Sequence, residues 1–275
     1  MRRVLRRVGR GTRIGYAFFD MGLSTAVNYP LDFVMSAVRP LVPVVTFFFV
    51  AQLVTNSPSV GGDYYSFVII GFLVTDALTG ALGGFTHEVQ SAVQQGRFEM
   101  LLVEPIPWGA LPFGLAAWHI ISRTVFAAFA MVVALALGAN FQLSRLPVAL
   151  LLFFLALGAG LVIGVLSGAI GVLSKRSDPV LTVYTLFAGI LSGVAFPIEL
   201  LPGPIRALSW VVPHTYVISG MRKLLLLDGL QGPGPTVLQA IAGLAVFNIV
   251  GFPIVLWLFG RIMEAGRRTG VLSGY

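Results

Sequence analysis

Four ionisable residues lie within or next to long apolar stretches of this 275-residue chain: Asp76, Glu88, His119 and Arg123. An unpaired charge in hydrocarbon is expensive, so such groups mark functional sites or internal ion pairs. His119 and Arg123 are four residues apart, which places them on one face of a helix. Because two cations there would repel each other, we expect a neutral His119 and an ion pair between Arg123 and Glu88. That pair would tie the second apolar stretch to the third, in a structural role rather than in ion transport.

No catalytic motif can be completed from these residues or from others. His87 and Glu88 lack a second His four residues on, and neither Ser167 nor Ser192 completes G-x-S-x-G. The chain has no Cys, which excludes disulfides and thiolate metal sites. It also lacks the G-x-x-x-x-G-K-[ST] pattern of a nucleotide-binding loop. We therefore expect no catalytic residue, no metal site and no bound cofactor in this chain.

The composition is that of an integral membrane protein. The chain is 57% hydrophobic and 11% charged, whereas soluble domains carry about 25% charged residues. The net charge is +7, but its placement argues against a nucleic-acid partner. Arginines cluster before the first apolar stretch and after the last, which is the flanking pattern of cytoplasmic ends; these are Arg2, Arg3, Arg6, Arg7, Arg10, Arg13, Arg261, Arg267 and Arg268. No small-residue cleavage site is evident, so we expect no cleaved signal peptide.

The apolar stretches predict an all-α protein whose 275 residues form a single transmembrane domain with six spans. The predicted spans are 31–54, 64–86, 111–138, 147–173, 180–196 and 237–259, and the fifth is short. Arg39 and Pro40 interrupt the first, so its hydrocarbon crossing is expected closer to 40–54. Gly160, Gly164 and Gly168 recur every four residues, a spacing that lets another helix approach closely. We favour packing within one subunit over dimerisation there.

The topology follows from the Lys and Arg residues. Most of them fall in 1–28, 87–110, 174–179 and 260–275, and four fall in predicted outer segments: Arg145, Arg206, Arg222 and Lys223. This bias places both termini of a multi-pass protein in the cytoplasm. We expect the membrane to be the plasma membrane of a bacterium. Arg222 and Lys223 are an exception to the positive-inside rule, because they are adjacent basic residues in a predicted outer segment.

Three segments are more than linkers. Residues 1–28 alternate arginines with apolar residues, as an amphipathic helix in the cytoplasmic interface would. Residues 197–235 are proline-rich, and their apolar runs are too short to cross and return, which indicates re-entrant or interfacial half-helices. The segment 87–110 holds the amphipathic stretch Gln94 to Pro107, in which Arg97, Glu99 and Glu104 accompany Phe98, Leu101 and Leu102. It predicts a short helix that docks onto another protein.

Two of these segments carry a resemblance to a known family. In the first, the order Gly96, Glu99, Leu101-Leu102, Pro105 is similar to the coupling helix of ABC transporter permeases of the type-2 exporter class. Arg97 stands where that family often has a small residue or Thr. In the second, the prolines, acid and aromatic residue match the family's outer re-entrant hairpin before the last span, at Pro197, Glu199, Pro202, Pro213, His214, Tyr216 and Arg222.

The resemblance implies a function that no single motif shows. A separate cytoplasmic ABC ATPase would bind ATP and Mg and dock on the coupling residues, which are Gly96, Arg97, Phe98, Glu99, Leu101, Leu102 and Pro105. The chain itself would not be an enzyme. Two permease copies, or the chain and a paralogue, would form a dimer that exports a drug, a lipid or a lipid-linked glycan. Two alternatives remain: an ion-coupled carrier, for which Asp76 is the candidate acid, and a membrane assembly protein that transports nothing.

Overall fold

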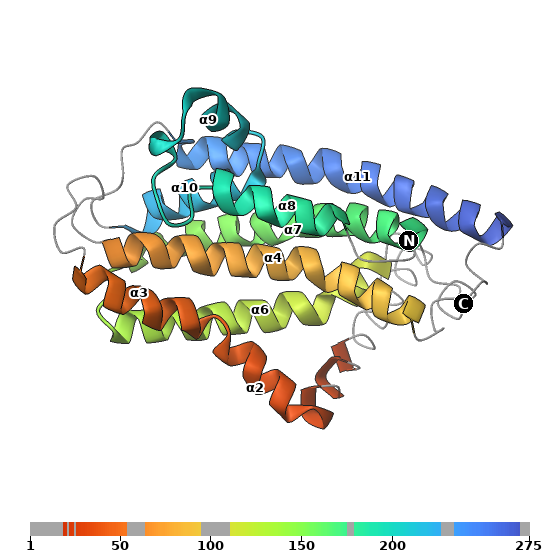
Figure 1. The fold of residues 1–275 in the computed structure, drawn as a ribbon, viewed down its shortest axis with the longest axis horizontal. Helices are drawn as coiled ribbons and strands as arrows, with labels where there is room; N and C mark the ends of the chain where they lie inside the picture. The colour runs from red at the N-terminus through yellow and green to blue at the C-terminus, as the bar shows by residue number, and fades with distance from the viewer. Residues whose placement is uncertain are drawn as a thin grey trace, which may run out of the picture.

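The computed structural model describes residues 19–20, 22–24, 26–53, 64–94, 111–174, 179–226 and 234–269, and all regular structure in these ranges is helical (Figure 1). The helices are α2 (Pro30–Val38), α3 (Leu41–Leu53), α4 (Tyr64–Gln94), α6 (Leu111–Ala136), α7 (Leu146–Ser174), α8 (Pro179–Leu191), α9 (Gly203–Ser209), α10 (Pro213–Leu225) and α11 (Val237–Thr269). Two short 3-10 helices are η2 (Leu143–Arg145) and η3 (Ile198–Leu200). The expected all-α class is confirmed for this part of the chain.

Within the described ranges, five helical stretches are long and apolar enough to cross a membrane: Phe33–Leu53, Tyr64–Ala92, Leu111–Ala136, Leu143–Gly171 and Val237–Ala265. The protein is therefore a multi-pass membrane protein. Helix α8, in the fifth predicted span, has 13 residues. At 1.5 Å per residue it covers about 20 Å of the roughly 30 Å hydrocarbon layer. The count of six spans stays a prediction.

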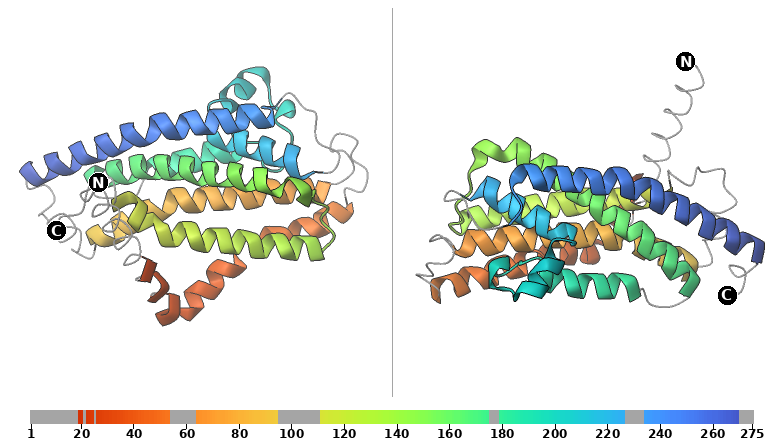
Figure 2. Two further views of the ribbon diagram at one scale, coloured as in Figure 1. Left: turned by 180° about the vertical axis from the view of Figure 1, so that it is seen from behind. Right: turned by 90° about the horizontal axis from the view of Figure 1, so that it is seen from above.

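The long helices run side by side along one axis, and α9 stands out from one end (Figure 2). Helices α4 and α7 form the centre of the bundle, and α10 packs against both of them and against α11. The faces of α3, α6, α8 and α11 that point away from the centre carry large exposed apolar side chains. Such faces suit lipid tails or a second membrane subunit.

The first predicted span is broken. Helix α2 ends at Val38, Arg39 and Pro40 form a turn, and α3 begins at Leu41. Proline has no N–H to donate to the preceding turn, so the helix cannot run straight through Pro40. Figure 1 shows α2 turning away from the direction of α3. Of the predicted stretch 31–54, α3 packs along α4 and α6, whereas α2 touches α6 through the ring of Phe33, whose centroid lies 5.3 Å from that of Phe126.

Small residues let α7 approach α4 closely. A Cβ on Gly160 would lie 2.9 Å from the Leu78 carbonyl oxygen, and one on Gly164 would collide with the Leu82 carbonyl oxygen. The hydroxyl of Thr86 donates a hydrogen bond to the Gly164 carbonyl oxygen at 3.1 Å. The glycines spaced four apart on α7 are therefore used within one subunit, as favoured from the sequence.

The amphipathic segment 1–28 lies mostly outside the described residues, namely at 1–18, 21 and 25. The residues described between 19 and 28 are largely helical and reach α6. The rings of Phe19 and Trp118 have centroids 5.7 Å apart. Gly22 lies against the same Trp118, where a Cβ would collide with the ring. This end of the segment is thus packed on α6, and its place at a membrane interface stays a prediction.

Candidate functional site: a polar seam and a buried arginine along α4

Charged side chains of α4 and α6 meet along one line, which we call the polar seam: Asp76, Gly80, Gly84 and Glu88 of α4 with His119 and Arg123 of α6. The α4 residues recur every four positions, so they share one stripe of that helix. Arg123 Nη1 donates to Asp76 Oδ2 at 3.4 Å. His119 Nε2 lies 3.1 Å from Glu88 Oε1. Two polar pairs therefore join α4 to α6.

The two glycines of the polar seam make room for the α6 side chains. A Cβ on Gly80 would lie 2.7 Å from both Cγ and Cδ of Arg123, and one on Gly84 would lie 2.6 Å from Cβ of His119. The arginine and histidine consequently lie against bare α4 backbone, between the two acids. Larger residues at positions 80 and 84 would push α6 away from Asp76 and Glu88.

The partners expected from the sequence are corrected by this arrangement. We predicted an ion pair between Arg123 and Glu88. In the structure Arg123 pairs with Asp76, and Glu88 pairs with His119. The reason is the antiparallel order of the helices: Arg123 follows His119 by one turn and so lies nearer the start of α4. Side-chain exposures of 17% for Arg123 and 27% for Asp76 show a half-buried pair rather than a dry catalytic site.

A buried arginine holds the other end of α4. Arg222 of α10 is 5% exposed. Its Nε donates to the Phe67 carbonyl oxygen at 3.1 Å, and its two terminal nitrogens donate to the carbonyl oxygens of Gly193 and Val194. The guanidinium carbon also lies 3.4 Å from the centroid of the Phe67 ring. One side chain therefore joins α10, α4 and the bend after α8, and we call it the Arg222 anchor.

Local backbone geometry explains how three carbonyls converge on Arg222. Gly193 has φ +68°, a left-handed conformation that favours glycine. It ends α8 and turns the carbonyl groups of Gly193 and Val194 inward. On α4, Gly71 leaves room for them, since a Cβ there would collide with the Val194 carbonyl oxygen. A buried charge is tolerated when its donors are satisfied in this way.

Sequence reasoning missed the Arg222 anchor. It treated Arg222 and Lys223 as outer cations that oppose the charge rule, whereas Arg222 is an interior residue. The available signal was an arginine within a largely apolar stretch of helix, which requires internal partners. Lys223 differs, because it is partly exposed and donates to the Gly234 carbonyl oxygen at 2.8 Å. Burial lowers the pKa of Lys223, and the charge of Glu199 acts in the opposite direction.

The residues expected in a re-entrant hairpin lie in the connection between α8 and α11. Pro197 and Glu199 belong to the η3 turn, Pro202 precedes α9, and Pro213, His214 and Tyr216 lie in the first turns of α10. His214 is buried, and its Nδ1 lies 2.9 Å from the Tyr184 hydroxyl of α8. The connection is thus packed onto the bundle, and its depth in the membrane stays a prediction.

The predicted coupling residues Gly96, Arg97, Phe98, Glu99, Leu101, Leu102 and Pro105 lie outside the described residues. The helices on either side of them are described. Helix α4 continues past residue 86, where the predicted span ended, through Glu88 to Gln94, and α6 begins at Leu111. The segment between them therefore connects the same two helices that the polar seam joins.

Comparison with known proteins identifies the family. The family model described as ABC-2 type transporter matches residues 18–226, which include the polar seam and the Arg222 anchor. The inner membrane transport permease YadH of Escherichia coli K12 is 28% identical over 211 residues, covering 75% of this chain and 77% of the relative. Nodulation protein J of Sinorhizobium fredii is 25% identical over 205 residues, covering 73% of this chain and 75% of the relative. The chain belongs to the ABC-2 type transporter family of membrane permeases.

Proposed function

We propose that this chain is the permease subunit of an ATP-driven exporter. It moves a hydrophobic or amphipathic molecule, such as a drug, a lipid or a lipid-linked glycan, out of the cytoplasm or the inner leaflet. ATP and Mg are bound and used by a separate cytoplasmic ATPase, and this chain performs no catalysis. Both termini lie in the cytoplasm. A relative named as an inner membrane transport permease supports the transport role.

The observation that carries this proposal is the linkage of α4 and α6 on either side of residues 95–110. Helix α4 has 31 residues, about 46 Å, which exceeds the roughly 30 Å hydrocarbon layer. We place the excess at the final turns of α4, which hold polar residues from Glu88 to Gln94, on the cytoplasmic side where the ATPase would dock. Because the polar seam bonds α4 to α6, a push on the segment tilts both helices as a pair.

The same helix carries the movement to the far end of the bundle. Phe67 and Gly71, in the first turns of α4, contact the Arg222 anchor and the bend after α8. A tilt of α4 therefore moves α10 and the connection that leads to α11. Substrate passes between two permease subunits, since one bundle of this size is too small to enclose a path for a large amphiphile.

The two alternatives are less well supported. An ion-coupled carrier needs an acid that is free to bind the coupling ion, and Asp76 accepts a hydrogen bond from Arg123. A membrane assembly protein without transport fits poorly beside a relative named as a transport permease.

Transport in proteoliposomes tests the proposal. The chain is purified together with a candidate partner ATPase, and uptake of candidate drugs, lipids and glycans is measured. We expect uptake that requires ATP on the ATPase side and survives an uncoupler at constant ATP. Uptake that an uncoupler abolishes would indicate the ion-coupled carrier. An ATPase that neither co-purifies nor responds to the permease would contradict the proposal.

A further inference from the structure

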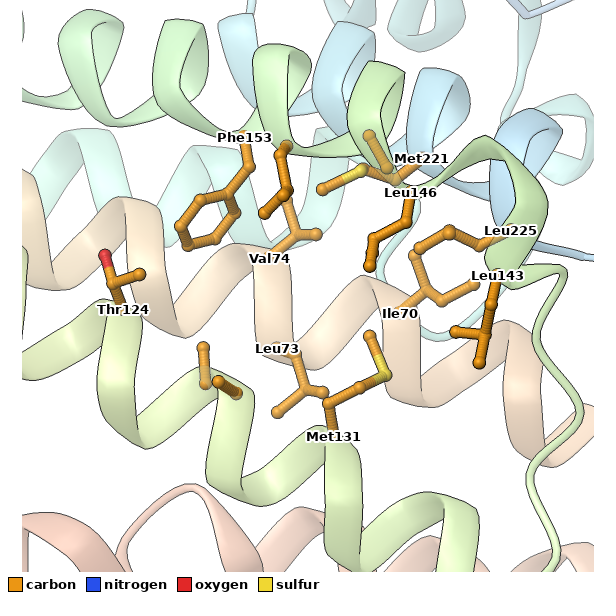
Figure 3. A pocket seen from close by; sticks show the side chains of 14 residues that line it. Ile70, Leu73, Val74, Thr124, Met131, Leu143, Leu146, Phe153, Met221 and Leu225 are labelled. Carbon is orange, nitrogen blue, oxygen red and sulfur yellow. The ribbon is translucent and has the colours of Figure 1, made fainter.

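An apolar cavity of about 300 Å³ lies between α4, α6, α7 and α10, beside the polar seam (Figure 3). Its wall includes Val74 of α4, Met131 of α6, Phe153 of α7 and Met221 of α10. The hydroxyl group in the wall, on Thr124, donates to the Ile120 carbonyl oxygen at 2.7 Å. The wall therefore presents hydrocarbon to whatever fills the cavity.

Such a cavity selects an apolar occupant. Water needs two to four polar partners, and apolar cavities of about 150 Å³ stay dry and bind small hydrocarbons. Pockets that hold ligands begin at about 300 Å³. An empty cavity of this size would cost packing energy along the centre of the bundle.

The opening of the cavity faces away from the bundle. On the inner side, Ile70 of α4 and Leu225 of α10 are buried. On the outer side, Leu146 and Leu150 of α7 are 42% and 45% exposed, and Ala128 of α6 is exposed beside them. The exposed neighbours along α6 are apolar too, among them Val125, Phe129 and Val132. An opening between two spans, bordered by exposed apolar side chains, gives access to lipid tails.

An exposed arginine lies next to the cavity wall in the sequence. Arg145 is exposed and belongs to η2, directly between Leu143 and Leu146, which line the cavity. A guanidinium near the end of a span is well placed to bond a lipid phosphate. We propose that the cavity holds one acyl chain of a membrane phospholipid, whose phosphate lies at Arg145. This lipid stays bound within one subunit. It is not the transported molecule, which in the proposed function passes between two subunits.

Photolabelling of the permease in lipid nanodiscs tests the site without the ATPase or transport. The nanodiscs contain phosphatidylethanolamine with a diazirine in one acyl chain, and labelled residues are mapped by mass spectrometry. We expect label on cavity residues such as Met131 and Phe153. Ala128→Phe, which closes the opening from an exposed position, should reduce that label to background. Ala136→Phe is the matched control, because Ala136 is an exposed residue of α6 that does not line the cavity.

A second comparison tests the phosphate contact. Arg145→Gln should weaken labelling by the phospholipid and leave labelling by a diazirine diacylglycerol unchanged. Equal labelling of wild type and Arg145→Gln by the phospholipid would overturn the assignment of the phosphate to Arg145. Label confined to exposed residues such as Val125, or unchanged by Ala128→Phe, would overturn the acyl-chain site. A change of oligomeric mass in Ala128→Phe without loss of cavity label would show that the opening is an interface between copies.

Discussion

Arg123 of α6 reaches Asp76 of α4 across Gly80, with 3.4 Å between Nη1 and Oδ2. The absence of a side chain at position 80 is what allows this reach. Gly84 serves His119 in the same way, one turn along each helix. Charge pairing and close packing thus act at the same place, and both bind α4 to α6. Each contribution can be tested separately.

Substitutions at two neighbouring glycines of α4 measure the contribution of close packing separately from that of charge pairing. In Gly84→Ala the new methyl group meets His119 Cβ, so we expect a loss of about 1–3 kcal/mol of stability from overpacking. Gly83 has nothing within 4 Å of a Cβ, and Gly83→Ala should gain up to about 1 kcal/mol from helix propensity. Unfolding in detergent measures both variants. Equal effects at positions 83 and 84 would contradict the close contact with His119.

Charge pairing is isolated by a double-mutant cycle on Asp76 and Arg123. Asp76→Asn leaves a half-buried guanidinium with a weaker partner, and we expect a loss of about 1–3 kcal/mol. Combining it with Arg123→Gln should cost less than the sum of the two single changes, because the partners share one interaction. Unfolding midpoints of the four proteins give the coupling energy. Strict additivity would show that the pair contributes nothing to the α4–α6 joint.

Replacing Arg222 should loosen a segment that is distant from it in the sequence, namely the bend after α8. Arg222→Lys replaces a planar group that reaches three carbonyl oxygens with a single ammonium, so we expect a loss of about 3 kcal/mol. Hydrogen exchange should rise in residues 192–212, since the bend after α8 loses its attachment to α4. Lys223→Gln is the control on the same helix, because Lys223 is partly exposed. Equal exchange in the two variants would argue against the anchor.

The sequence predicts the helices well and their contacts poorly. The long apolar runs predicted α6 and α7 correctly. An apolar segment that crosses a bilayer has to form a helix, because its backbone groups find no other hydrogen-bond partners there. It ended the second span at residue 86, whereas the backbone hydrogen bonds of α4 continue through polar residues to Gln94. It extended the fifth span to 196, although Gly193 has a left-handed backbone that ends the helix.

Side-chain partners depend on how two helices are aligned, and hydropathy carries no information on that. From the sequence we expected Glu88 as the partner of Arg123, and that expectation was wrong because the alignment of α6 along α4 brings Arg123 to Asp76 instead. The four-residue repeat of Asp76, Gly80, Gly84 and Glu88 was the signal available in the sequence. Two small residues between two acids on one helix face indicate that another helix packs closely there, with polar side chains that can pair with the acids.

In the proposed function, ATPase movement enters through residues 95–110 and is passed to α4 and α6. Leu101→Lys and Leu102→Lys should abolish stimulation of the partner ATPase, because a charge in an apolar docking face disrupts it. The matched control is Leu200→Lys, the same change at an exposed leucine of η3.

The most direct measurement is the ATPase rate of the reconstituted complex, with membrane insertion of each permease variant verified. We expect a rate equal to that of the ATPase alone for Leu101→Lys and Leu102→Lys, and full stimulation for Leu200→Lys. Full stimulation by inserted Leu101→Lys and Leu102→Lys would contradict the proposed function.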